Sequence, residues 1–221
     1  MELATGVEAL EVTVDRGEQQ MTFYPVVVET DRGTILVDVG LHGHVDAYRT
    51  ALEDTGHDLE AVTAIVLTHQ DGDHAGAIGP IADATDATVY AHRLATPFID
   101  GERELAKGDG RYPPHPVDVQ LVDDVRFRTW AGQMQVVFTP GHAPGHISLY
   151  FPDAELLLAA DALTAPSGTL AGPNEQFTID WSTAVDSIER LAELDVDRTH
   201  CYHGGPTDDG TDRLTELAAT L

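Results

Sequence analysis

Short apolar runs separated by polar turns dominate the order of hydrophobic and polar residues along this chain. Residues 64–67 read Ala-Ile-Val-Leu and residues 136–138 read Val-Val-Phe. Apolar runs of this length, bounded by turn formers, are typical of buried strands. The pattern predicts strands at 7–14, 21–29, 34–38, 63–67, 88–91, 120–122, 125–129, 134–138, 147–151 and 156–159.

Helical spacing occurs in three other stretches. Apolar residues recur at intervals of three and four over 44–55, 76–84 and 181–193, which predicts amphipathic helices there. An amphipathic helix and a half-buried sheet each need a partner for their apolar faces, so helices packed outside two sheets are the natural arrangement. We therefore predict an α/β (α+β) fold of two sheets with helices on the outside.

The densest polar motif follows directly after one of these strands. His69, Asp71, Asp73 and His74 take four of six consecutive positions after the strand 63–67. Regular secondary structure positions such side chains more firmly than a free loop would. Because they offer nitrogen and oxygen donors, the motif predicts a site for zinc, iron or manganese.

Three more candidate ligands, His142, Asp161 and His203, also lie at or near the ends of apolar segments. We expect these segment ends to converge on one rim. The rim would then carry a mixed set of imidazoles and carboxylates without thiolate chemistry. Seven ligands are too many for one ion.

The order and spacing of these motifs resemble the metallo-β-lactamase superfamily over nearly the whole chain, from the strand 34–38 to His203. The resemblance implies an αββα sandwich of two mixed sheets with helices outside, with 1–221 as a single metallo-β-lactamase-fold domain. It also implies two metal ions and a bridging hydroxide as the nucleophile, with Asp73 as the catalytic residue that orients it. By the same resemblance, the first ion takes His69, Asp71 and His142, the second takes Asp73, His74 and His203, and Asp161 bridges both.

Asp71 departs from the superfamily's usual His-x-His-x-Asp-His motif, in which a histidine stands at this position. The substitution adds a carboxylate to the ligand set, so a bound water would be acidified less and iron or manganese would be held relatively better. A carboxylate here also resembles the superfamily's di-iron oxidoreductases. The alternative interpretation is that Asp71 is a solvated turn residue and that the site holds one metal.

The formal net charge of −26, from 38 acidic and 12 basic residues, limits the classes of molecule that the protein can bind. Without a basic stripe to follow a phosphate backbone, the sequence argues against nucleic acid. The acidic residues are spread along the chain, which suits concentrated salt, where screening weakens their mutual repulsion. We interpret the protein as halophilic; an ordinary acidic protein from a low-salt cell is the alternative.

The sequence also bears on the compartment. It shows neither a basic and apolar leader nor a run of about 20 apolar residues, so we expect a cytoplasmic protein without a membrane segment. Cys201 is the single cysteine, which leaves no internal disulfide, and we expect it to be a buried small residue.

Residues 93–119 have little periodicity and are rich in turn formers around 108–116. In the superfamily the corresponding insertion covers the metals. The resemblance therefore implies a lid or substrate loop at 93–119, with Phe98, Tyr112 and His115 as candidate wall residues.

Together these features predict a dinuclear metal-dependent hydrolase of a small ester-like substrate, such as a lactone, a thioester or a phosphoester. The expected cofactors are two divalent ions, zinc first, with iron or manganese as alternatives. The expected partner is a small-molecule substrate, and the sequence does not give the oligomeric state. The alternatives are a non-haem iron oxidoreductase of the same fold and a metal-stabilised binding or regulatory protein.

The odd ligand yields a direct test. Asp71→His restores the common ligand set, so we expect it to raise zinc affinity and to shift the pH optimum of activity downward, because the site becomes more positive. Zinc competition against a chromophoric chelator and a pH–rate profile measure the two effects. An unchanged metal preference and pH profile would place Asp71 outside the ligand set.

Overall fold

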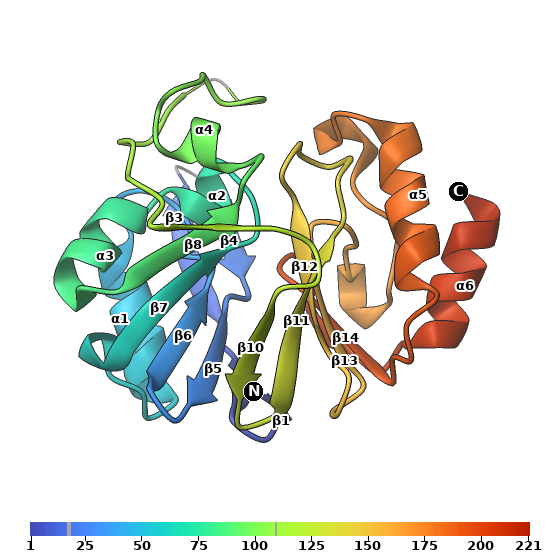
Figure 1. Cartoon of the computed structure of the whole chain (residues 1–221), viewed down its shortest axis with the longest axis horizontal. Coiled ribbons are helices and arrows are strands. Elements are labelled where there is room, and N and C mark those ends of the chain that lie inside the picture. The colour runs from blue at the N-terminus through green and yellow to red at the C-terminus, as the bar shows by residue number, and fades with distance from the viewer. Residues whose placement is uncertain (17–18, 109) are drawn as a thin grey trace.

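Two β-sheets packed face to face form the centre of the computed structural model, which describes residues 1–16, 19–108 and 110–221 (Figure 1). The first sheet has seven strands and the second has six. The first runs in the order β1 (Glu2–Ala4), β2 (Val7–Ala9), β5 (Val26–Thr30), β6 (Gly33–Val37), β7 (Val62–Leu67), β8 (Thr88–His92) and β9 (Val119–Leu121).

The second sheet follows in chain order. It consists of β10 (Arg126–Thr129), β11 (Gly132–Phe138), β12 (Ile147–Phe151), β13 (Leu156–Ala160), β14 (Arg198–Cys201) and β15 (Gly205–Thr207). Both sheets are mixed, because β6, β7, β8 and β9 pair in parallel in the first sheet, whereas only β13 and β14 do so in the second. A separate hairpin pairs β3 (Val12–Arg16) with β4 (Gln19–Phe23).

Helices cover the outer faces of both sheets (Figure 1). Helices α1 (Val45–Asp54) and α3 (Ile78–Thr85) lie over the first sheet, and α5 (Trp181–Leu191) and α6 (Thr211–Thr220) lie over the second. Two short helices, α2 (Gly72–Ala75) and α4 (Thr96–Ile99), lie near the upper rim in this view. Three single turns of 3₁₀ helix lie at Leu59–Ala61, Pro166–Gly168 and Glu175–Phe177. The order helix, sheet, sheet, helix confirms the αββα sandwich.

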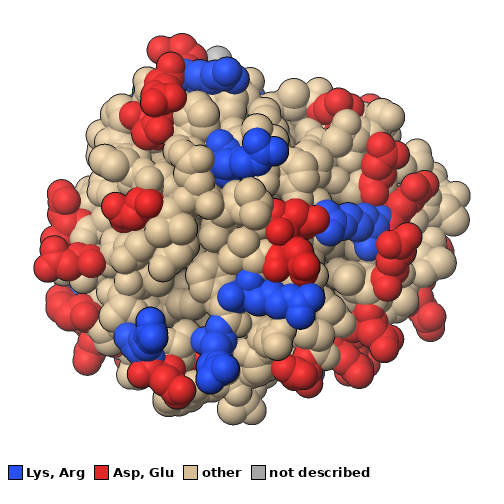
Figure 2. All heavy atoms as spheres, viewed as in Figure 1, with Lys and Arg blue, Asp and Glu red and all other residues tan. Residues whose placement is uncertain are grey.

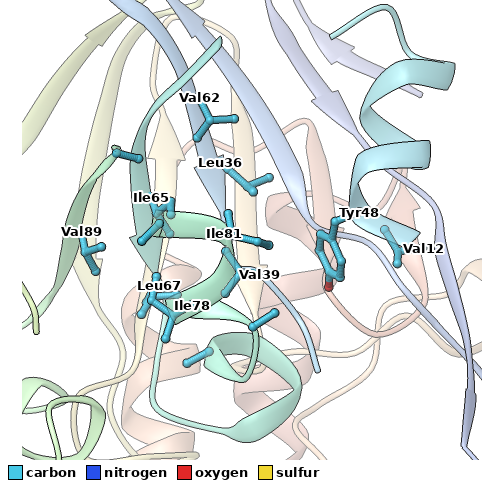
Figure 3. Close-up of a cluster of buried hydrophobic side chains, with 14 of the residues drawn as sticks. Val12, Leu36, Val39, Tyr48, Val62, Ile65, Leu67, Ile78, Ile81 and Val89 are labelled. Atoms are coloured by element: carbon cyan, nitrogen blue, oxygen red, sulfur yellow. The ribbon is translucent and has the colours of Figure 1, made fainter. Parts of the chain in front are cut away.

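Three layers of apolar side chains hold the elements together, and strand β7 contributes to two of them. Its side chains alternate between the two faces of the sheet. Ile65 and Leu67 pack toward α1 and α3 (Figure 3), whereas Val66 packs between the sheets. A strand covered on both faces reads as a continuous apolar run, as this one does. A third apolar layer lies between the second sheet and the pair α5 and α6.

Some boundaries differ from the sequence predictions. The strand expected at 7–14 is divided into β2 and β3, and the strand expected at 21–29 is divided into β4 and β5. Pro25 stands at the second break, where it has no N–H to give to a ladder, although its carbonyl accepts from Leu10 N at 2.8 Å. The chain can therefore turn away there into the separate hairpin.

The helix expected at 76–84 is α3, and a separate short helix, α2, precedes it. α2 begins earlier, inside the ligand motif, and α3 carries the apolar face. The helix α6 lacked a sequence prediction because its apolar positions, Leu214 and Leu217, are few, and they become buried only against the second sheet and α5. Within the described residues, no helix is long and apolar enough to cross a membrane.

Acidic side chains lie around the edge of the face shown in Figure 2 and also near its middle, and most of the basic side chains on this face lie beside acidic ones. Mutual repulsion of the carboxylates opposes the compact state. We expect the free energy of unfolding to rise between about 0.1 M and about 1 M KCl, because the Debye length falls from about 10 Å to about 3 Å. Chemical denaturation at a series of salt concentrations measures this.

Equal ionic strengths of KCl and NaCl should act alike in that series, because screening depends on ionic strength. A midpoint of unfolding that stays constant or falls with salt would contradict the halophilic interpretation.

Candidate metal centre

The rim above the sandwich, at the ends of β7, β11, β13 and β14, carries all seven side chains that the sequence singled out as ligands. The potential ligand atoms form three overlapping groups, and within each group they lie within 4.8 Å of one another. The groups are His69, His74 and Asp161; His69, Asp71 and His142; and Asp73, His74 and His203.

Asp71 belongs to this cluster and is not a solvated turn residue. Its Oδ2 lies 3.3 Å from His69 Nε2 and 3.2 Å from His142 Nε2, and its side chain is only 13% exposed. Burial by itself raises the pKa of Asp71, but the neighbouring imidazoles and Lys107 outweigh it and hold this pKa well below its usual value. The odd residue of the motif is therefore an anionic oxygen donor directed at two histidines.

Asp161 connects the two halves of the cluster. Its Oδ2 lies 3.3 Å from His142 Nε2 and 3.4 Å from His203 Nε2, and its Oδ1 lies 3.2 Å from His74 Nε2. Asp73 Oδ2 lies 3.3 Å from His203 Nε2. One carboxylate thus faces ligand atoms from both groups that the superfamily pattern assigns to separate ions.

A buried carboxylate behind the cluster sets the orientation of two of its imidazoles. Asp38 accepts hydrogen bonds from Thr68 N at 2.8 Å, from Thr68 Oγ1 at 2.7 Å and from His74 Nδ1 at 2.8 Å. Thr68 Oγ1 in turn lies 3.0 Å from His69 Nδ1. With Nδ1 of each ring donating to these oxygens, the Nε2 lone pairs of His69 and His74 point into the cluster.

Several inner atoms of the cluster lack a hydrogen-bond partner in the described part of the chain. Among the residues that the structure describes, His69 Nε2, His74 Nε2, Asp71 Oδ1 and Asp161 Oδ1 are buried without a hydrogen-bond partner. Buried polar atoms left unpaired in this way are costly. A metal ion coordinated by these nitrogens and oxygens satisfies them together, so the residues fit the metal that the motif predicts.

His146 is a support and not a ligand. Its Nε2 accepts the backbone N–H of Asp161 at 3.1 Å, and its Nδ1 lies 3.0 Å from the carbonyl oxygen of Thr139. Burial and the neighbouring His69 lower its pKa well below the usual value, so the ring is neutral and can accept. His146 therefore fixes the backbone of Asp161.

Backbone contacts position two other candidate ligands, His142 and Asp73. Gly141 precedes His142 with φ +124°, and a Cβ there would lie 2.3 Å from Ala184 N of α5, so only glycine lets the His142 loop pack this closely. Tyr202 is buried and donates its hydroxyl to the backbone carbonyl of Asp73 at 2.6 Å. Cys201 is fully buried, and burial raises the pKa of its thiol, as expected of a packing residue.

The candidate wall residues of the segment 93–119 have different positions. Tyr112 is buried, and its hydroxyl donates at 2.9 Å to the carbonyl of Gln70, inside the ligand motif. Phe98 and His115 are half-buried, and His115 Nδ1 lies 2.8 Å from the carbonyl of Pro116. Among the described residues, no hydrogen bond joins Phe98 or His115 to a candidate ligand.

Sequence reasoning missed Lys107. Its Nζ lies 2.8 Å from Asp71 Oδ2 and 2.7 Å from His142 Nε2. The available signal was its position, because the only lysine of a strongly acidic chain lies in the segment implied to be a lid. Exposed Phe177 and Ile179 near His142 were also missed; Ile179 N donates to the carbonyl of His142 at 3.4 Å.

Comparison with known proteins agrees with this geometry. The family model of the metallo-β-lactamase superfamily matches residues 24–203. The chain belongs to the metallo-β-lactamase superfamily. Its relatives support a hydrolase, since it is 29% identical to "Probable metallo-hydrolase YflN" of Bacillus subtilis (strain 168), over the whole of this chain and 92% of that protein.

Two further likenesses are informative. A hydroxyacylglutathione hydrolase of Cereibacter sphaeroides (strain ATCC 17029 / ATH 2.4.9) is 33% identical over 60% of this chain, which spans only 44% of that protein's length. Among solved structures, a metallo-β-lactamase family protein of Thermus thermophilus has a TM-score of 0.79 and 24% identity, over 99% of this chain and 80% of that one. This second likeness concerns the fold alone.

The support from Asp38 can be tested by replacing its carboxylate. Asp38 has φ +62°, a conformation that asparagine adopts readily, so Asp38→Asn preserves the backbone. Its amide has one acceptor oxygen where the carboxylate has two, so it cannot accept all three hydrogen bonds from Thr68 and His74, and the contact that fixes the His74 tautomer is weakened. We expect metal affinity to fall about 10–100-fold, measured by competition with a chromophoric chelator.

Asp31→Asn is the matched control for this substitution, because Asp31 is exposed and accepts from Trp130 Nε1. It should bind metal like the unaltered protein. Equal metal affinity in both variants would show that the Asp38 contact does not orient the ligands.

Proposed function

We propose that the protein is a dinuclear metal-dependent hydrolase of a small ester-like substrate. The observation that carries this proposal is the set of three overlapping ligand groups, joined by Asp161, on one rim. Zinc is the first candidate metal, with iron or manganese as alternatives. His69, Asp71 and His142 would hold one ion, Asp73, His74 and His203 the other, and Asp161 would face both.

The chemistry divides between the ions and the chain. When bound, the metals supply Lewis acidity, which activates water and polarises the bond under attack. Burial raises the pKa of Asp73, but the hydrogen bond to His203 and the charges of His74 and His203 together outweigh it and lower this pKa, so the carboxylate is ionised and can accept a proton. We assign to Asp73 Oδ the role of orienting the attacking water and passing its proton to the leaving group.

The surroundings of His142 favour a substrate with an apolar part. Phe177 is 54% exposed and Ile179 is 48% exposed, and their backbone lies against Lys107 and His142. Large apolar side chains exposed beside a catalytic cluster are typical of a binding wall. Hydroxyacylglutathione hydrolases, which act on thioesters, are among the relatives of the chain. Thioesters are therefore the first substrate class to test, followed by lactones and phosphoesters.

We further infer that 1–221 is one domain in which the segment 93–119 is a lid over the metals; Asp109 lies outside the described residues. Lys107 and Tyr112 support this inference, because both reach the ligand motif. The spread of acidic residues and the lone buried Cys201 support a salt-rich cytoplasm as the compartment.

A second candidate function is a non-haem iron oxidoreductase. Asp71 favours it, because a carboxylate oxygen at this place in the cluster is a harder donor than imidazole and suits iron. Iron in the purified protein together with oxygen uptake would support this candidate over the hydrolase.

The hydrolase proposal is tested by metal content and by activity. We expect about two metals per chain by mass spectrometry, and turnover of at least one ester class that a chelator abolishes and zinc restores. Asp73→Asn should lower kcat about 10²–10⁴-fold, since a carboxamide cannot take the proton.

Asp180→Asn is the control for that variant, because Asp180 caps α5 by accepting from Thr183 N and asparagine caps equally well. It should retain full kcat. A metal-loaded protein that hydrolyses none of the thioesters, lactones and phosphoesters would contradict the proposal.

A further inference from the structure

One cation of the chain already lies among the proposed metal ligands. Lys107 Nζ lies 2.8 Å from Asp71 Oδ2, 2.7 Å from His142 Nε2 and 3.0 Å from the His142 carbonyl oxygen, and it also donates to the carbonyl of Phe177. The side chain is 20% exposed. These contacts place the ammonium inside the cluster and not on its outer surface.

The ammonium uses the atoms that one ion would need. Asp71 Oδ2 lies 3.3 Å from His69 Nε2 and 3.2 Å from His142 Nε2, so these three atoms are close enough to serve as the ligand atoms of the group formed by His69, Asp71 and His142. A lone pair that accepts a hydrogen bond from an ammonium is not free to coordinate a metal, and a divalent ion at this distance would repel the ammonium strongly. Lys107 and an ion at this group therefore exclude each other.

The other half of the cluster has a different environment. Asp73, His74 and His203 form the second group, and among the described residues no lysine or arginine pairs with Asp73 or Asp161. Two of the cluster's three carboxylates therefore face only imidazoles, whereas Asp71 faces an ammonium as well. The two half-sites are electrostatically unequal.

The charge of Lys107 also matches the unusual residue of the motif. Asp71, Asp73 and Asp161 carry three negative charges, and one ammonium offsets one of them. The single lysine of a chain with net charge −26 thus lies at the carboxylate that stands where a histidine is usual. A lysine suits a removable counter-ion, because its charge is a point on a flexible stem.

We propose that Lys107 is an internal counter-ion that competes with metal for the half-site of His69, Asp71 and His142. The first ion binds in the half of Asp73, His74 and His203, where no ammonium opposes it. The second ion binds only when the Lys107 side chain withdraws, and this makes its affinity weaker. Occupancy of the second ion is thereby coupled to the position of a residue in the segment 93–119. The inference rests on the proposed function for its metal dependence.

The test is a zinc titration of metal-free protein followed by calorimetry and by metal analysis after dialysis. In the unaltered protein we expect one tight and one weaker equivalent. Lys107→Met keeps the apolar stem and removes the charge, so the second equivalent should bind on the order of tenfold more tightly, with the first unchanged. Arg103→Met is the matched control, since it removes an exposed positive charge from the same segment and should change neither affinity.

A second readout follows the amine itself. Because Lys107 is the only lysine, acetic anhydride can acetylate only this side chain and the N-terminus among the amines, and peptide mass spectrometry separates the two. The rate of acetylation at Lys107 should rise on addition of the second zinc equivalent but not of the first. A rate that the second equivalent leaves unchanged would overturn the proposal.

The outcomes also separate this inference from the proposed function. Two ions of equal affinity, unchanged in Lys107→Met, would overturn the role of Lys107 and leave the hydrolase standing. Stepwise binding that Lys107→Met makes equal, in a protein without hydrolytic activity, would support the counter-ion and contradict the hydrolase. A protein that binds no metal would overturn both.

Discussion

The arrangement of the candidate metal ligands depends on the buried carboxylate of Asp38. It joins the end of β6 to Thr68 at the end of β7 and to His74 in α2, through three hydrogen bonds of 2.7–2.8 Å. A carboxylate that is 1% exposed is tolerable only when its oxygens are satisfied in this way. The same contacts direct the Nε2 atoms of His69 and His74 inward, so the fold's stability and the ligand geometry share one interaction.

The cluster also concentrates negative charge in a chain that already carries a large excess of it. Asp71, Asp73 and Asp161 converge although carboxylates repel one another, because imidazoles lie between them and the sheets hold the strand ends in place. The ammonium of Lys107 relieves this repulsion at Asp71. If the rim binds cations as proposed, the carboxylates must be held together before the cations arrive, and the Lys107–Asp71 contact would contribute to this.

The sequence predicted an element well where both faces of the segment are buried, because the segment then shows a continuous apolar run. The run 64–67 of β7 is apolar on both sides because one face meets helices and the other meets a sheet, and its end fixes the position of His69. The sequence predicted elements less well where their existence or their ends depend on packing against segments far away in the chain. The narrow apolar face of α6 becomes buried only when it packs against α5. The first predicted strands are divided where the β3–β4 hairpin leaves the sheet.

The sequence by itself determined the fold class and the candidate ligands, because their residue types and their places after apolar strands are local properties of the chain. Only the tertiary structure decided which side chains surround the candidate ligands. Lys107 reaches His142 across 35 residues of sequence, and His146 accepts from the backbone of Asp161 across 15. Such contacts arise only when two sheets and a loop are packed together, because hydrogen bonds require distances and angles that residue order does not specify.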